Sequence, residues 1–330
     1  MCKENNSKAA LLYRLLTLVA VALLAASYFS PVWWVSLKAP QYPDVAFPDG
    51  IRIHFHNDSV QNGCKLIKSA EKFEDEALNC KHEMDAINHY VGMFPIAAGG
   101  PVERAYSPIL FSLLGVMMIG FATPRKFRVG ALGVMSAGLA IWMTLAMQTE
   151  GGVKYLSPGF VDDIAGTLQI NESEYGHWTG LKAIEESYSE ALDRYFRKKQ
   201  ENDARVKVML TAAKVVYWGL LLSLLALVIV VWKVPKFYWA LALVPIILPV
   251  AFLIEYSAWL WWFGHSLHEM AAFSIKPFMP TVLGDGKVAQ FVTHSYPHYG
   301  YAFMVASSFC MILAALIRRK SLKETEGRCD

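Results

Sequence analysis

Six long apolar runs constrain this chain more than any other feature of its sequence. A helix needs about 20 predominantly apolar residues to cross the hydrocarbon core of a bilayer. The runs meet or approach that length and cover residues 9–28, 108–123, 129–147, 209–232, 237–263 and 299–317. The second is short, and we expect its helix to begin nearer Ala105, because Pro108 suits the first turn of a helix better than its middle. The sequence therefore predicts a mainly α, polytopic membrane protein with six transmembrane helices.

Composition and charge support this class. Of the 330 residues, 55% are hydrophobic and only 18% are charged, whereas about a quarter of the residues of a soluble protein are charged. This excludes an ordinary cytosolic enzyme. The net charge of +3 is too small to indicate a nucleic-acid partner, which leaves the lipid bilayer as the first expected partner.

Basic residues predict the orientation, because Lys and Arg concentrate in short cytoplasmic loops. They occur before the first run, in two tight connections and after the last run, at Lys3, Lys8, Arg125, Lys126, Arg128, Lys233, Lys236, Arg318, Arg319 and Lys320. Six spans put all of these on one side. We therefore expect a bacterial inner-membrane protein with cytoplasmic termini, and with Trp33 and Trp34 in an outer interfacial belt. The first run could instead be a cleaved signal peptide.

Most of the chain outside the membrane then faces the periplasm, in the segments 29–107, 148–208 and 264–298. We expect these three segments to form a cap, and we divide the chain into 1–147, 148–208 and 209–330. An oxidising compartment would allow Cys64 and Cys80 to form a disulfide; two buried thiols or a thiol metal site are the alternatives. Apolar residues at helical spacing predict an amphipathic helix near 181–205, which either docks on neighbouring outer segments or binds a partner.

All nine histidines fall in the outer segments, and two groups of them suggest a metal. His54 and His56 alternate with apolar residues as on a strand, so they share one face and are either a metal pair or the wet side of that strand. In residues 82–93, a helix that ends at Gly92 would align Asp85, His89 and Met93 on one stripe. His and Met together favour copper; a hydrogen-bonded His and a packed Met are the alternative reading.

The third outer segment carries further candidates. If the fifth span continues, His265 and His268 lie on one helical face, with Met270 close behind. A turn is expected at 284–286, and His294 leads into the sixth span. These residues could form a copper site or could be interfacial histidines that cap helices. Our metal-ligand candidates are His89, Met93, His265, His268, Met270 and His294. We assign no catalytic or cofactor-binding residue. No histidine lies within a predicted span, which argues against a haem inside the membrane.

Four phrases together resemble an uncharacterised family of bacterial polytopic membrane proteins. They are SPVWWVSLKAPQYP at 30–43, INHYVGM at 87–93, GHSLH at 264–268 and LGDGKVAQF at 283–291. The resemblance covers the first outer segment and the last third of the chain, while residues 148–205 look like an addition. The resemblance implies a gene cluster that encodes nitrous-oxide reductase and its copper supply. Among the ligand candidates, it supports mainly His89, Met93 and His265.

The sequence leads to three functional hypotheses. The first is a membrane accessory protein for copper handling or for maturation of a periplasmic copper enzyme. Delivery of the ion by ligand exchange would need no covalent chemistry, and the partner would be a periplasmic copper protein or a membrane complex. The second is a scaffold without metal that docks a periplasmic partner. The third is a subunit that passes electrons from quinol to the periplasm, for which no cofactor ligand is visible.

Overall fold

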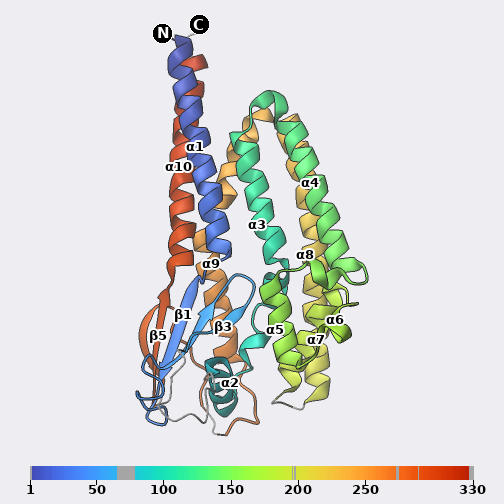
Figure 1. Cartoon of the computed structure of the whole chain (residues 1–330), viewed down its shortest axis with the longest axis vertical. Helices are drawn as coiled ribbons and strands as arrows, with labels where there is room; N and C mark the ends of the chain where they lie inside the picture. The colour runs from blue at the N-terminus through green and yellow to red at the C-terminus, as the bar shows by residue number, and fades with distance from the viewer. Residues whose placement is uncertain are drawn as a thin grey trace.

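The structure is a computed structural model that describes residues 2–64, 79–194, 196, 198–272, 275–288 and 290–326. Six helices are long and apolar enough to cross a membrane, which confirms the predicted number. They are α1 (Cys2–Tyr28), α3 (Pro101–Ala122), α4 (Arg125–Gln148), α8 (Lys199–Lys233), α9 (Ala240–His265) and α10 (Tyr299–Glu326). Figure 1 shows the chain termini and the α3–α4 turn toward one end of these helices and the strands toward the other.

Helix α3 begins earlier than predicted, at Pro101, which occupies the first turn after the left-handed Gly100. Pro108 consequently lies inside the helix, where it cannot donate a backbone hydrogen bond to the carbonyl of Arg104. The hydroxyl of Ser107 donates to that carbonyl instead, at 2.8 Å. A side chain thus satisfies the acceptor that the proline leaves, as a helix in an apolar environment requires.

Two buried arginines satisfy the carbonyl end of α3. Arg128 donates from Nε to the carbonyl of Gly120 at 3.1 Å, and Arg318 of α10 donates to the carbonyl of Phe121. The guanidinium of Arg318 also lies 4.5 Å from the ring centroid of Tyr238. These contacts give the last carbonyls of a membrane helix the partners they lack within the helix.

Outside the helical bundle the chain forms a five-stranded antiparallel sheet, which the sequence predicted only at its strand around His54. The strands are β1 (Trp33–Lys38), β2 (Ile51–Phe55), β3 (Val60–Asn62), β4 (Gly284–Val288) and β5 (Phe291–Pro297), in the order β3-β2-β1-β5-β4. The central strand β1 pairs with β5, and this pairing joins the two ends of the sequence (Figure 1). The turn predicted at 284–286 is wrong, because these residues pair with β5 as part of β4.

The two adjacent tryptophans of β1 face opposite sides of the sheet. Trp33 is only 1% exposed and packs against Tyr256 of α9 and Tyr301 of α10, with ring centroids 5.4 and 5.6 Å apart. Its Nε1 donates to the hydroxyl of Ser295 at 2.9 Å. Trp34 lies on the other face by strand alternation. Trp33 therefore belongs to the core of the protein, because the strand turns this side chain inward; its depth relative to a bilayer stays a prediction.

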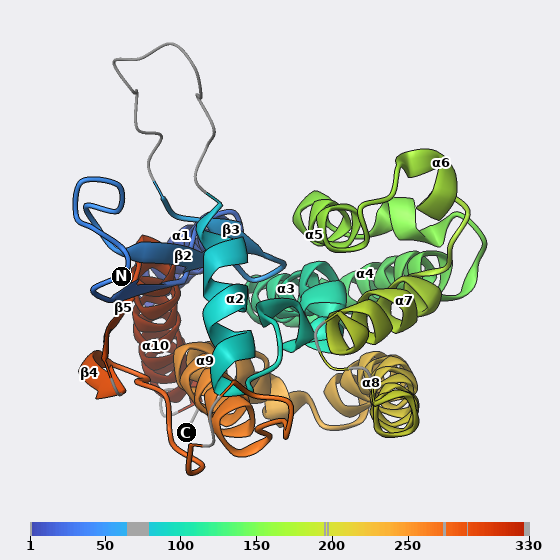
Figure 2. The same ribbon diagram turned by 90° about the horizontal axis from the view of Figure 1, so that it is seen from below.

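Short helices complete this end of the molecule, which Figure 2 shows from below. They are α2 (Cys80–Val91), η1 (Ile96–Ala98), η2 (Gly152–Tyr155), α5 (Pro158–Leu168), α6 (Glu172–Tyr175) and α7 (Gly180–Asp193). At the opposite end, η3 (Pro235–Trp239) connects α8 to α9 (Figure 1). The helix predicted at 181–205 is two helices, α7 and the start of α8. Ile184, Tyr188 and Leu192 are buried, which confirms that α7 docks its apolar side on neighbouring segments.

Candidate functional site

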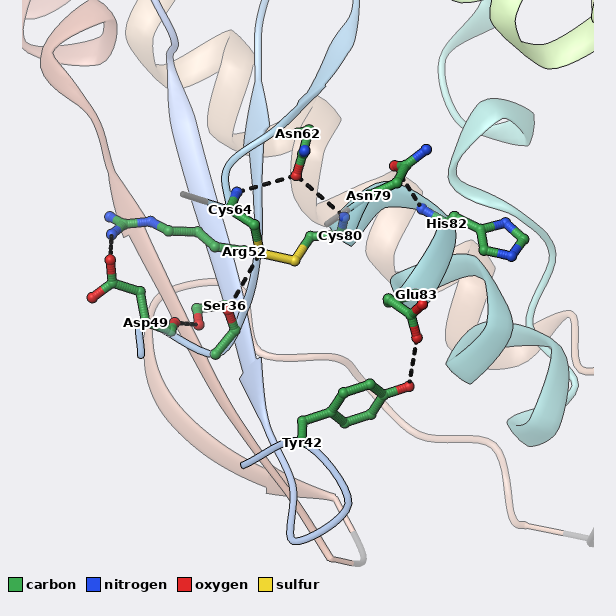
Figure 3. The surroundings of a disulfide bond; sticks show 11 residues. Ser36, Tyr42, Asp49, Arg52, Asn62, Cys64, Asn79, Cys80, His82 and Glu83 are labelled. Carbon is green, nitrogen blue, oxygen red and sulfur yellow. Dashed lines mark hydrogen bonds and ion pairs between the residues drawn. A yellow bond between two sulfur atoms is a disulfide. The ribbon is translucent and has the colours of Figure 1, made fainter. Parts of the chain in front are cut away.

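The predicted disulfide is present and ties the sheet to α2 (Figure 3). It joins Cys64, just after β3, to Cys80, the first residue of α2, across a separation of 16 residues. The side-chain oxygen of Asn62 accepts the backbone N–H groups of both Cys64 and Cys80, at 3.1 and 3.2 Å. One amide therefore holds both ends of the loop that the disulfide closes.

Replacing Cys64 and Cys80 together with serine is expected to lower the free energy of unfolding by about 3 kcal/mol, because the cross-link removes loop entropy from the unfolded chain. Thermal unfolding of the detergent-purified protein measures this loss. The Cys310→Ser variant is the control, since Cys310 forms no disulfide. If the double variant unfolds at the same temperature as the wild type, the cross-link does not restrain the unfolded chain.

A cluster of ionic groups joins three extramembrane or interfacial elements. Asp163 of α5 accepts hydrogen bonds from Lys81 of α2 and from Arg104 of α3. The Asp163 side chain is 7% exposed and that of Arg104 is 10% exposed. Arg104 also donates to the backbone carbonyl of Ala97 at 2.6 Å. Asp163 thus connects the first and second outer segments to the beginning of a membrane helix.

The sheet face opposite Trp33 gathers histidines from both ends of the sequence. Trp34 pairs with His54 on β2 and with Tyr296 on β5, so all three side chains share this face. His56 and His298 follow two residues after His54 and Tyr296. The rings of His54 and His298 lie 5.2 Å apart between centroids. The strand predicted around His54 is present, but β2 ends at Phe55, so His56 and His298 lie just beyond the ends of their strands. Both still lie close enough to His54 to act on it electrostatically.

These imidazoles are held in the neutral form. Burial, with the nearby charge of Arg52, lowers the pKa of His54 to about 4. Burial also lowers the pKa of His56 and of His298. His54 Nε2 is buried and has no hydrogen-bond partner among the described residues. A neutral ring with an unpartnered nitrogen is the form in which histidine binds a metal ion.

His294 lies on the same face as His54, but its Nδ1 is engaged at 2.6 Å by the carboxylate of Asp285 on β4. The hydroxyl of Tyr296 donates to the same carboxylate oxygen at 3.0 Å. Trp34 stacks on Tyr296 with ring centroids 5.4 Å apart, and the guanidinium of Arg52 lies 4.0 Å from the Trp34 ring centroid. Stacked aromatic and ionic groups therefore surround the histidines.

Three other predicted ligands meet where α2 ends. Gly92, at φ 84, ends α2 as predicted, and its carbonyl accepts the N–H of His268 at 2.7 Å. Met93 lies beyond the helix end, so the predicted helical stripe stops at His89. The His268 ring stacks on Phe196, with centroids 4.1 Å apart, and burial together with the charge of Lys198 lowers its pKa.

The remaining two candidates, His265 and Met270, are not part of the group at the end of α2. His265 is the last residue of α9, and its ring stacks on Trp261 with centroids 4.5 Å apart. The helix does not continue to His268, so the predicted shared helical face is wrong. Met270 is 50% exposed. Ligation of copper by any of the six candidates stays a prediction.

Within the described part of the chain, no group of three or more His, Cys, Asp or Glu side chains is arranged to hold a metal ion. Comparisons with protein-family models, curated proteins and solved structures found no match to the chain. The fold itself defines a multi-pass membrane protein that carries a small disulfide-linked sheet outside its helices. His298 is not among the ligand candidates predicted from the sequence, although its alternation with His294 and Tyr296 is a usable strand signal.

Proposed function

We propose that this membrane protein handles copper on the periplasmic side, with Cu(I) bound between His54 and His298 on the open face of the sheet. The observation that carries the proposal is the close approach of these two rings, 5.2 Å between centroids, with His54 Nε2 buried and without a partner.

The ligand chemistry favours Cu(I) over Zn²⁺. Structural zinc takes four ligands in a closed tetrahedral site, and the described residues contain no such group. Imidazole suits copper, and Cu(I) is stable with two or three ligands. A site with few ligands releases its ion readily by ligand exchange, as a protein that hands copper to a periplasmic partner requires. The basic residues at the opposite end of the helices, such as Arg125 and Lys126, support a periplasmic placement of the sheet.

Titration of the purified, full-length protein with Cu(I) against a colorimetric chelator tests the proposal. We expect the wild type to bind one equivalent and the His54→Ala, His298→Ala variant to lose that binding. The His265→Ala, His268→Ala variant is the matched control and should retain it. No binding by the wild type would end the copper proposal, and loss only in the control variant would move the site to the end of α2.

A further inference from the structure

A polar cavity lies on the other side of α2, away from the histidines of the sheet. Its volume is about 180 Å³, and it opens between α2, η1, α5 and α7. Ionisable side chains line much of it, namely Lys81, His82, Asp85 and Arg194. The volume corresponds to about six water molecules at ~30 Å³ each, so the cavity can hold a small organic molecule but not a drug-sized one.

The carboxyl group of Asp85 is the most unusual feature of this cavity. The residue is 5% exposed, and its Oδ1 accepts the backbone N–H of Ile96 at 2.7 Å. The carboxyl group makes no other hydrogen bond with the described residues. Burial raises the pKa of Asp85 to about 6, against the opposing effect of the Ile96 hydrogen bond. A buried carboxylate that keeps a free oxygen at a cavity is costly unless a donor occupies that cavity.

Two cations border the same space. Arg194, which ends α7, donates one hydrogen bond to the backbone carbonyl of Thr167 at 3.3 Å, so its guanidinium keeps further N–H donors. Lys81 lines the cavity and also pairs with Asp163, which does not line it. Both cations, and also Asp163, act electrostatically on Asp85. A ligand with only positive charge would be repelled by Arg194 and Lys81, whereas a ligand with only negative charge would be repelled by Asp85.

We propose that this cavity binds a small zwitterion, with its amino group on Asp85 and its acidic group on Arg194 and Lys81. A molecule of the size and charge of a simple amino acid satisfies both kinds of lining group at once, through charge-assisted hydrogen bonds. Gln169 lines the same cavity and takes a left-handed conformation, φ 56, at the end of α5. The site uses none of the proposed copper ligands, so either proposal can fail without the other.

The test uses the purified, full-length protein and isothermal titration with glycine and L-alanine at millimolar concentration. Three analogues accompany them, ethylamine with only the amino group, acetate with only the acid, and N-acetylglycine with the amino group blocked. We expect a zwitterion to bind at least about tenfold more tightly than any analogue. The proposal is overturned if neither zwitterion binds, or if an analogue binds as well.

A variant locates the binding. Asp85→Asn keeps the acceptor for the Ile96 N–H and nearly the same shape, but removes the charge. Zwitterion binding should fall at least about tenfold in this variant. Glu83→Gln is the matched control on the same helix, because Glu83 contacts Tyr42 and does not line the cavity; it should bind as the wild type does. Equal binding by Asp85→Asn and the wild type would overturn the assignment, and the analogue series decides even if that variant does not fold.

Discussion

Replacing Trp33 with alanine is expected to lower the free energy of unfolding by about 3–5 kcal/mol, the range for large aromatic side chains removed from a core. Trp33 is almost completely buried and lies where the central strand of the sheet meets α9 and α10. The substitution leaves a cavity at that junction and also removes the donor to the Ser295 hydroxyl. Thermal unfolding of the purified protein, followed by tryptophan fluorescence and circular dichroism, measures the effect.

Trp34→Ala is the matched control, because it removes the same side chain from the next position on the same strand. Trp34 stacks on Tyr296 on the other face of the sheet, so its removal should cost about 1 kcal/mol. Equal losses for the two variants would contradict the packing described for Trp33.

Replacing Asp163 with alanine is expected to cost about 3–5 kcal/mol, because it leaves two cations close together without their shared anion. The Lys81 and Arg104 side chains, 22% and 10% exposed, would then repel each other at the junction of α2, α3 and α5. We expect α5 to separate first, which limited proteolysis of the purified protein would detect together with a lower melting temperature.

Asp162→Ala serves as the control for Asp163, since Asp162 is the adjacent carboxylate and is exposed. Its effect should stay within about 0.5 kcal/mol, as for most surface substitutions. A wild-type melting temperature for Asp163→Ala would show that this ionic cluster contributes no net stability.

The membrane helices were predictable because the bilayer imposes a length and an apolar composition on each one separately. Their ends were less predictable. Helix α3 begins at Pro101 and continues through Pro108, where the hydroxyl of Ser107 replaces the missing backbone donor. The disulfide was also predictable, since Cys64 and Cys80 share an outer segment and need only an oxidising compartment.

The candidate sites were harder to predict, because their members come from segments far apart in the sequence. His54 and His298 meet only because β1 pairs with both β2 and β5. No local pattern near either histidine specifies that pairing. Likewise, Asp85 and Arg194 line one cavity only because α2 and the end of α7 come together there.

By itself, the sequence determined that this chain carries six runs able to span a membrane, that Cys64 and Cys80 share one outer segment, and that His54 lies on a strand in alternation with apolar residues. These properties depend on short stretches of chain in contact with lipid or water, whose periodicity is visible residue by residue. Only the tertiary structure decided that Trp33 is core, that His298 joins His54, and that Asp85 faces a cavity. Each of these depends on the register and packing of distant segments, which is fixed by complementary side chains and not by local pattern.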